Sequence, residues 1–567
     1  MIKIANKKTK NFVSQILLIL CVLNYSFKLY AQELKNQKES TLSDKIASNY
    51  SEYVPDKNIG SSILVAKAGE IIYQNAFGLA NVEFEVPMQN DIILGIGSIT
   101  KQFTAISIIK LIEEGRVSLD DKISKYIKDY PQGDNITIEN LLRHTSGIIS
   151  FEKLQKFSGK NGKYKDYTPN EVIEEIKKAP LEFEPGTQWS YSNSGYFILG
   201  YIIQQVTQKT YQKFLEENIF EPFGLKHTYY GSNAEIIKKK ATGYKIDNNT
   251  IIYADYISMS LAYSVGAIYS TTADLHNFYA KLFNTEFINP ETLEMMCQPT
   301  ILKTGEPCQY GLGFFINEIQ GAKAVGHTGG INGYSSSIQY IPGEKIFVCV
   351  LSNVEGTHSA VLSRNIAATV LGKPFEKIKA INVEKVALEE YEGVYKNEKT
   401  VLEIDENEGK LFAKTVGNTF ELVPYAIDSF YISGLDVSIS FMRNKKLEIE
   451  KMVESKMDGT SKIILEKNAP IETMPAISVK PEILKLYEGD YQLNQQTFIT
   501  ITTNSGKLLL QVTGQNQYEL IPKTDVLFKV NGVDAAIEFK ENIHQKIDKL
   551  VLYQFGKQIE CKRVIEK

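Results

Sequence analysis

The chain has 567 residues, of which 43% are hydrophobic and 23% are charged, and its formal net charge is −4. This length exceeds that of one ordinary domain, so we expect several. The small net charge gives no reason to expect a nucleic-acid partner. Five cysteines are too few for a disulfide scaffold.

Residues 1–31 are typical of an export signal. Four lysines precede an apolar stretch, residues 12–23, that is too short to span a bilayer comfortably. Cleavage after Ala31 would remove five lysines and no acid, which changes the formal net charge to −9. No later segment is apolar enough to cross a membrane. We therefore expect a periplasmic or extracellular protein with no stable membrane insertion after signal cleavage.

The mature chain opens with a predicted strand pair, residues 62–66 and 70–77, followed by Ser98 and Lys101. An apolar run over residues 103–112 predicts a buried helix, with Ser98 at its start. Residues three apart share a helix face, so the Lys101 amine can reach the Ser98 hydroxyl. A serine becomes nucleophilic when a neighbouring group helps to remove its proton. Taken alone, Ser-x-x-Lys is better explained as a chance pattern with a helix-capping serine.

Tyr191-Ser192-Asn193 follows a turn at residues 185–187 and precedes a helical run over residues 196–206. The triplet is therefore expected on a loop, where catalytic groups are common. The Tyr191 hydroxyl can pass protons, and the Asn193 amide can both donate and accept hydrogen bonds. The alternative is an ordinary turn with a packed tyrosine.

His327-Thr328-Gly329-Gly330 lies among predicted strands over residues 322–325, 335–340 and 346–351. The two glycines allow a ligand to approach the backbone closely. An edge strand here would offer an N–H group to a developing oxyanion. The alternative is a hairpin turn with a surface histidine.

In order and spacing, these three segments resemble the motifs of the serine penicillin-recognising enzymes. The nearest branch holds class C β-lactamases, D-alanyl-D-alanine carboxypeptidases, D-aminopeptidases and related esterases. The resemblance covers roughly residues 40–372 and extends to residues 141–147 and 270–275. It implies an α+β fold in which helices cover both faces of an antiparallel sheet. The active site would lie at the junction with a helical subdomain.

The resemblance also implies a role for each motif residue. Ser98 would be the acylated nucleophile, and Lys101 would lower the barrier to its deprotonation. Tyr191 would act as general base and then as general acid toward the leaving group. Which of the two takes the first proton stays open. The N–H groups of Ser98 and Gly330 would form the oxyanion hole. The substrate would be held by Asn193, His327, Thr328 and Gly329.

His327 departs from the β-lactamase pattern, which has lysine at this position. An imidazole is mostly neutral at pH 7, so the fixed cation that would meet a β-lactam carboxylate is missing or depends on pH. This favours an exported serine hydrolase that acts on D-amino-acid peptides or esters. The alternatives are a true β-lactamase and a penicillin-binding or sensing protein without turnover.

Other chemistries find no support in the sequence. It holds no His-Glu-x-x-His, no Cys-x-x-Cys and no Gly-x-x-x-x-Gly-Lys, so we expect neither metal nor cofactor, only a small-molecule or peptide substrate. His144 lies beside a serine, but we interpret it as part of the end of a helix over residues 138–143. Whether Cys297 and Cys308 form a disulfide stays open.

We expect the hydrolase domain to occupy residues 32–372, followed by a lysine-rich linker. An internal repeat follows, at residues 387–467 and 482–567, with matching segments 96 to 98 positions apart, such as 388–395 and 484–491. Short alternating strands predict two small antiparallel β-barrels. They resemble the lipocalin-like extensions of some family members, which implies a route to a homo-oligomer.

Overall fold

The computed structural model describes residues 41–567 except for short segments: 55–57, 158–161, 248–249, 285–286, 357, 376–379, 382, 384–387, 398–400, 416–417, 433–436, 457–461, 469–478, 494–496, 505, 514–516, 532–534, 542–546, 555–556 and 565–567. The expected signal segment, residues 1–31, therefore lies outside the described residues. The chain divides into two compact units, and the boundary falls after Phe375.

The first unit is built on a six-stranded antiparallel sheet with the strand order β12-β13-β14-β15-β1-β2. Its N-terminal strands insert beside strands from the end of the unit, because β1 pairs with both β2 and β15. The strands are β1 (Ser61–Lys67), β2 (Glu70–Phe77), β12 (Phe315–Ile319), β13 (Ala322–Ile331), β14 (Tyr334–Ile341) and β15 (Ile346–Ser352).

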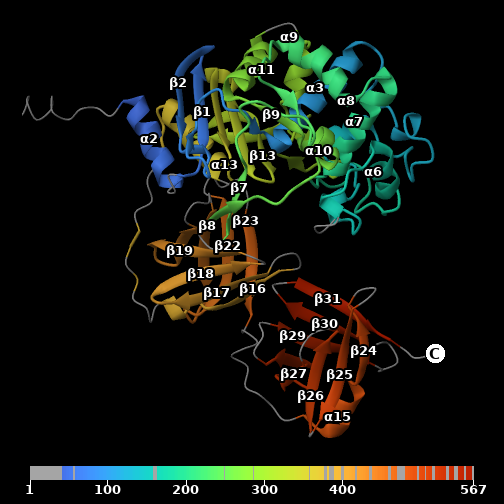
Figure 1. Cartoon of the computed structure of the whole chain (residues 1–567). Coiled ribbons are helices and arrows are strands. Elements are labelled where there is room, and N and C mark those ends of the chain that lie inside the picture. The colour runs from blue at the N-terminus through green and yellow to red at the C-terminus, as the bar shows by residue number, and fades with distance from the viewer. Residues whose placement is uncertain are drawn as a thin grey trace, which may run out of the picture. The chain divides into compact units, whose positions relative to one another are not determined.

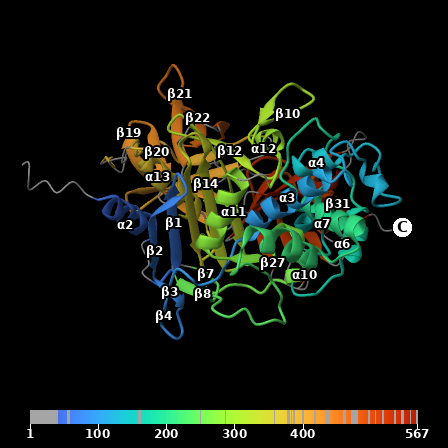
Figure 2. The ribbon, with the colours of Figure 1, turned by 90° about the horizontal axis from the view of Figure 1, so that it is seen from above.

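Both faces of this sheet are buried along β1, β14 and β15, whereas the edge strand β2 is mostly exposed. Successive side chains of a strand point to opposite faces, so Ile63 and Val65 of β1 join one core cluster while Leu64 and Ala66 join another. Helices α2 (Leu42–Tyr53) and α13 (His358–Val370) cover the first face, and α3 (Thr100–Glu113) and α11 (Thr272–Asn284) cover the second (Figure 2). Near-continuous apolar strands are the expected result of such double burial.

The segment between β2 and β12 contributes most of the helices of the first unit (Figure 1). They are α3 (Thr100–Glu113), α4 (Ile138–Leu142), α6 (Pro169–Ile176), α7 (Asn193–Thr207), α8 (Tyr211–Leu215), α9 (Glu221–Phe223), α10 (Met259–Gly266), α11 (Thr272–Asn284) and α12 (Pro290–Met296), with the short turns η1 (Gly97–Ile99), η2 (Ile123–Lys125), η3 (Phe151–Lys153) and η4 (Glu216–Phe220). A further short turn, η5 (Pro342–Glu344), joins β14 to β15. In the described part of the chain, no helix combines the length and the apolar character needed to cross a membrane.

Short strand pairs connect these helices. They are β3 (Leu79–Asn81) with β4 (Val86–Pro87), β5 (Leu94–Gly95) and β6 (Tyr229–Tyr230) on either side of β9 (Ile268–Ser270), β7 (Tyr244–Asp247) with β8 (Thr250–Tyr253), and β10 (Thr300–Ile301) with β11 (Pro307–Cys308). Helices α3, α7 and α10 pack against one another, and η1 packs against β13. This arrangement brings the helical segment to the sheet, as the family resemblance predicts.

The second unit contains two closed eight-stranded antiparallel barrels, which confirms the predicted pair of β-barrels. In the first barrel β16 pairs with β23, and in the second β24 pairs with β31, so neither has a free edge. The strands of the first barrel are β16 (Gly393–Lys396), β17 (Val401–Asn407), β18 (Lys410–Thr415), β19 (Asn418–Ala426), β20 (Ser429–Ile432), β21 (Val437–Arg443), β22 (Ile449–Lys456) and β23 (Lys462–Asn468).

The strands of the second barrel are β24 (Gly489–Gln492), β25 (Phe498–Asn504), β26 (Lys507–Val512), β27 (Gln517–Pro522), β28 (Leu527–Val530), β29 (Ala535–Glu541), β30 (Ile547–Gln554) and β31 (Lys557–Arg563), preceded by α15 (Pro481–Leu486). Each barrel contains the same internal hydrogen bond, at equivalent positions of the repeat. The Tyr395 hydroxyl donates to the Tyr391 carbonyl at 2.7 Å, and the Tyr491 hydroxyl donates to the Tyr487 carbonyl at 2.9 Å. The repeated sequence thus encodes a repeated buried contact.

Candidate active site

Ser98 lies in the turn η1, immediately before helix α3, and Lys101 lies in the first turn of that helix. The Lys101 Nζ donates to the Ser98 Oγ at 3.0 Å and to the Val265 carbonyl at 2.9 Å. Lys101 has no exposed surface, whereas Ser98 is partly exposed. The predicted neighbours on one helix face are therefore in direct contact.

Burial controls the charge of Lys101. Removal from water penalises an ammonium and lowers the pKa of Lys101 to about 7, while the negative charge of Glu152 opposes this shift. A substantial fraction of the amine is then neutral at physiological pH and can accept a proton. The strained backbone of Tyr263, with φ at +30°, lies two residues before the carbonyl of Val265 that holds this amine.

Tyr191 ends the loop before helix α7, and the Ser192 side chain caps that helix by accepting from the Gly195 N–H at 3.4 Å. The Lys101 Nζ lies 5.0 Å from the centroid of the Tyr191 ring. Burial raises the pKa of Tyr191 well above its usual range, and the nearby Ser98 side chain opposes this only in part. Because its pKa is raised, the Tyr191 hydroxyl keeps its proton at neutral pH. The hydroxyl oxygen is buried and has no partner of good hydrogen-bond geometry in the described structure, so its proton is available for donation.

The third motif, His327-Thr328-Gly329-Gly330, lies on β13, and the backbone of β13 packs against η1. Strand β12 pairs with β13 only as far as Gly326, so among the described residues the stretch from His327 to Gly330 has no strand partner on that side. A Cβ on Gly97 would lie 2.8 Å from backbone atoms of Gly330, and one on Gly329 would lie 2.0 Å from the Ile96 carbonyl oxygen. Only glycines permit this approach of the two backbones beside Ser98.

His327 is only 2% exposed. Its Nδ1 lies 2.6 Å from the Thr328 carbonyl oxygen, which can only accept, so Nδ1 carries the hydrogen and Nε2 accepts from the Tyr310 hydroxyl at 3.1 Å. Burial, together with the charge of Lys101, lowers the pKa of His327 to about 3. The position that holds lysine in class C β-lactamases is therefore uncharged at neutral pH. Thr328 and Gly330 are exposed.

His144 belongs to the site as well, which the sequence reasoning missed. Helix α4 ends at Leu142, as expected, but the His144 Nδ1 accepts from the Ser192 N–H at 3.1 Å. Its ring lies 4.3 Å from that of Tyr191, and burial holds the pKa of His144 well below its usual value. The neutral imidazole therefore fixes the loop that carries Tyr191.

Glu152 is a second residue that the sequence reasoning missed. It lies in η3, and its Oε1 accepts from the Asn193 Nδ2. Its Oε2 accepts from the Ser150 hydroxyl at 2.5 Å, and the Ser150 oxygen in turn accepts from the Asn193 N–H at 2.9 Å. No motif marks this carboxylate, because it reaches Asn193 across 41 residues of sequence.

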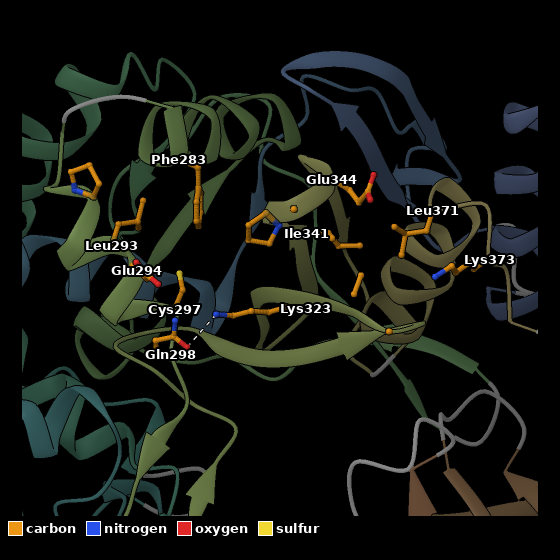
Figure 3. A pocket seen from close by; sticks show the side chains of 15 residues that line it. Phe283, Leu293, Glu294, Cys297, Gln298, Lys323, Ile341, Glu344, Leu371 and Lys373 are labelled. Atoms are coloured by element: carbon orange, nitrogen blue, oxygen red, sulfur yellow. Dashed lines mark hydrogen bonds between the residues drawn. The ribbon is translucent and has the colours of Figure 1, made fainter.

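One pocket lies away from these residues and does not contain the motifs. It has a volume of about 650 Å³ and lies between α12, the turn that joins β12 to β13, and η5 (Figure 3). None of the predicted site residues lines it. Across the described residues no group of His, Cys, Asp or Glu is placed to hold a metal ion, and Cys297 and Cys308 are both free.

The fold is that of a class of serine hydrolases, and comparison with known proteins agrees. Residues 47–372 match the family described as Beta-lactamase. The chain therefore belongs to the beta-lactamase family, whose members are serine hydrolases. This confirms the resemblance found in the sequence.

Individual relatives cover more of the chain. Penicillin-binding protein 4* from Bacillus subtilis (strain 168) is 28% identical over 412 residues, which span 67% of this chain and 89% of that protein. The octameric penicillin-binding protein homologue from Pyrococcus abyssi is 28% identical with a TM-score of 0.54, and the match covers 75% of this chain and 99% of the homologue. The D-amino acid amidase from Ochrobactrum anthropi SV3 shares the fold, with a TM-score of 0.52 at 24% identity over 59% of this chain and 99% of the amidase.

Proposed function

We propose that the protein is an exported serine hydrolase that acts through an acyl-enzyme on Ser98, with D-amino-acid peptides or esters as substrates. The observation that carries the proposal is the 3.0 Å contact between the Ser98 hydroxyl and the buried Lys101 amine. A neutral amine held against a hydroxyl is an activated nucleophile in the sense required for acyl transfer.

The proposed acylation step moves one proton in a circuit. The Ser98 Oγ attacks the substrate carbonyl carbon while its proton passes to the Lys101 Nζ, whose pKa of about 7 suits a base. The oxyanion is bound by the N–H groups of Ser98 and Gly330. Tyr191 donates its proton to the leaving nitrogen or oxygen and regains one from Lys101, and the carbonyl–leaving-group bond breaks. Water then attacks the ester carbonyl carbon and passes a proton to Lys101. The bond from this carbon to the Ser98 Oγ breaks, Oγ takes the proton from Lys101, and the carboxylic acid is released.

The remaining motif residues form the substrate-binding wall in this proposal. Asn193 and the backbone of Gly329 hold the substrate, and the exposed Thr328 offers a hydroxyl to it. His327 supports this wall as a neutral ring. Its lowered pKa favours peptidase or esterase activity over β-lactamase activity, because no fixed cation awaits a β-lactam carboxylate at this position.

Export and assembly extend the proposal beyond the catalytic unit. Residues 1–31 have the charge and length of a signal peptide, and a hydrolase of bacterial cell-wall peptides must lie outside the inner membrane. The Pyrococcus abyssi homologue, which is octameric, matches 75% of this chain. We propose that the barrels contribute to a homo-oligomer here.

Brief exposure to a fluorescent penicillin, followed by mass spectrometry, tests the nucleophile and separates the alternatives. With p-nitrophenyl acetate and a D-peptide as substrates, wild type should turn over and Ser98→Ala should not. A lasting penicillin adduct on Ser98 without ester turnover would favour a binding or sensing protein. Rapid turnover of nitrocefin would favour a β-lactamase. Equal hydrolysis by wild type and Ser98→Ala would refute the proposal.

A further inference from the structure

Ser336 is a buried serine of β14 whose side chain reaches the backbone that precedes Ser98. It lies opposite Gly329 in the pairing of β13 with β14. Its Oγ lies 2.8 Å from the Ile96 carbonyl oxygen and 3.4 Å from the Gly329 carbonyl oxygen. Both carbonyls can only accept and a hydroxyl has one hydrogen, so Ser336 donates to the nearer oxygen, that of Ile96. A side chain of the sheet is thus bonded to the residue two positions before the candidate nucleophile.

Gly329 makes room for this hydrogen bond. A Cβ on Gly329 would lie 2.3 Å from the Ser336 Oγ and 2.0 Å from the Ile96 carbonyl oxygen, closer than real Cβ atoms come. The hydroxyl and the carbonyl therefore meet in the space that a side chain at position 329 would fill. Gly329 directly precedes Gly330, whose N–H group is proposed to bind the oxyanion.

The backbone holds Ile96 on its other sides. Its N–H donates to the Ile268 carbonyl at 3.0 Å, and its carbonyl also accepts from the Ile99 N–H at 3.2 Å. A carbonyl oxygen has two lone pairs and can accept from both the Ile99 N–H and the Ser336 hydroxyl. The hydroxyl adds a link from the six-stranded sheet to this residue.

The serines on either side of Ser336 make different contacts. Successive side chains of a strand point to opposite faces. The Ser335 and Ser337 hydroxyls lie 2.9 Å and 2.7 Å from those of Ser359 and Ser363 on α13. The outer two of these three consecutive serines therefore tie the sheet to α13, while the middle one faces the candidate site.

We propose that Ser336 is a positioning residue for the oxyanion hole. This rests on the proposed function, in which the N–H groups of Ser98 and Gly330 bind the oxyanion. Ser336 acts through Ile96 on the segment that carries Ser98, and through the contact beside Gly329 on the strand that carries Gly330. Donors stabilise a developing oxyanion when they lie about 2.7 to 3.1 Å from it, so a small change in the separation of these two segments lowers the rate.

The test measures hydrolysis of p-nitrophenyl acetate and inhibition by phenylboronic acid on the full-length protein. Boron adds to a nucleophilic serine, and an oxygen of the tetrahedral adduct then occupies the oxyanion hole. Ser336→Ala should reduce kcat/KM by about tenfold to a hundredfold and raise the inhibition constant by a similar factor. The matched control is Ser337→Ala, which removes an equally buried hydroxyl from the same strand and should leave both values nearly unchanged.

A second variant separates the hydrogen bond from the packing. Ser336→Cys keeps the shape of the side chain but has only a weak S–H donor, so both values should change in the same direction as in Ser336→Ala. It also carries the test if Ser336→Ala does not fold. Misfolding lowers the rate and leaves the inhibition constant unchanged, and that result in both variants would overturn the inference.

Other outcomes would overturn it as well. One is unchanged kinetics in Ser336→Ala, and another is an equal loss in Ser336→Ala and Ser337→Ala. Failure of the proposed function looks different, because wild type and Ser98→Ala would then hydrolyse the ester equally.

Discussion

The Lys101 Nζ lies 3.0 Å from the Ser98 Oγ, and the surrounding residues bury Lys101 completely. Its other hydrogen-bond partner is a backbone carbonyl, that of Val265, and not a carboxylate. A neutral partner does not compensate for the loss of water around a charge, which is why the lysine pKa falls to about 7. The Lys101 amine therefore gains or loses its proton within the physiological pH range.

The first prediction concerns the pH profile of ester hydrolysis. The neutral form of Lys101 is the base, so kcat/KM for p-nitrophenyl acetate should rise with pH and reach half its maximum near pH 7. Lys101→Arg should be inactive at every pH up to 9, because a guanidinium does not lose its proton there. A flat profile between pH 5 and 9, measured after correction for spontaneous hydrolysis, would exclude Lys101 as the base.

The second prediction links Glu152 to that profile. Its negative charge stabilises the Lys101 ammonium, so Glu152→Gln should lower the pKa of Lys101 and move the midpoint to lower pH. The control variant Glu184→Gln removes an exposed carboxylate from the segment before Tyr191 and should leave the midpoint of the pH profile unchanged. A midpoint that moves to higher pH in Glu152→Gln would contradict the electrostatic assignment.

The third prediction separates two tyrosines, Tyr191 and Tyr196, whose rings lie near the Lys101 amine. Tyr191→Phe should reduce kcat by about 10²- to 10⁴-fold, the usual range for loss of an acid–base group. The Tyr196 hydroxyl instead donates to the Leu142 carbonyl at 2.8 Å, so Tyr196→Phe should cost about 1 kcal/mol of unfolding free energy and little activity. Steady-state kinetics and urea denaturation give both quantities. Similar kinetic losses in the two variants would remove Tyr191 from the proton circuit.

Much of this site can be predicted from the sequence because its spacing is local. Ser98 and Lys101 are three residues apart next to an apolar run, and helix geometry alone brings them together. The strands predicted over residues 62–66 and 346–351 were also found, since buried apolar runs favour the centre of a sheet. The convergence of three distant segments came only from their resemblance to a family, because no pairwise pattern carries that information.

The parts that were missed depend on contacts between loops or on the backbone. His144 contacts Ser192 across 48 residues, and Glu152 contacts Asn193 across 41, at positions where local sequence signals only turns and helix ends. The Val265 carbonyl has no side-chain signature at all. In the barrels, too, only local features could be predicted. The alternation of apolar and polar residues predicts the strands, but it does not predict the pairing of β16 with β23 that closes the first barrel.

The last prediction tests the approach of η1 to β13. Gly97 has φ at +49°, and a Cβ there would lie 2.8 Å from the backbone of Gly330, which cannot turn aside as a flexible side chain would. Gly97→Ala should therefore push apart the two N–H groups proposed to bind the oxyanion and reduce kcat by about 10²- to 10³-fold. Gly115→Ala is the matched control. Gly115 also has a positive φ, +70°, but its Cβ would meet nothing within 4 Å, so that variant should lose about 1 kcal/mol of stability and keep its activity. If Gly97→Ala kept full activity with the same small loss in thermal denaturation, the proposed oxyanion hole would have to lie elsewhere.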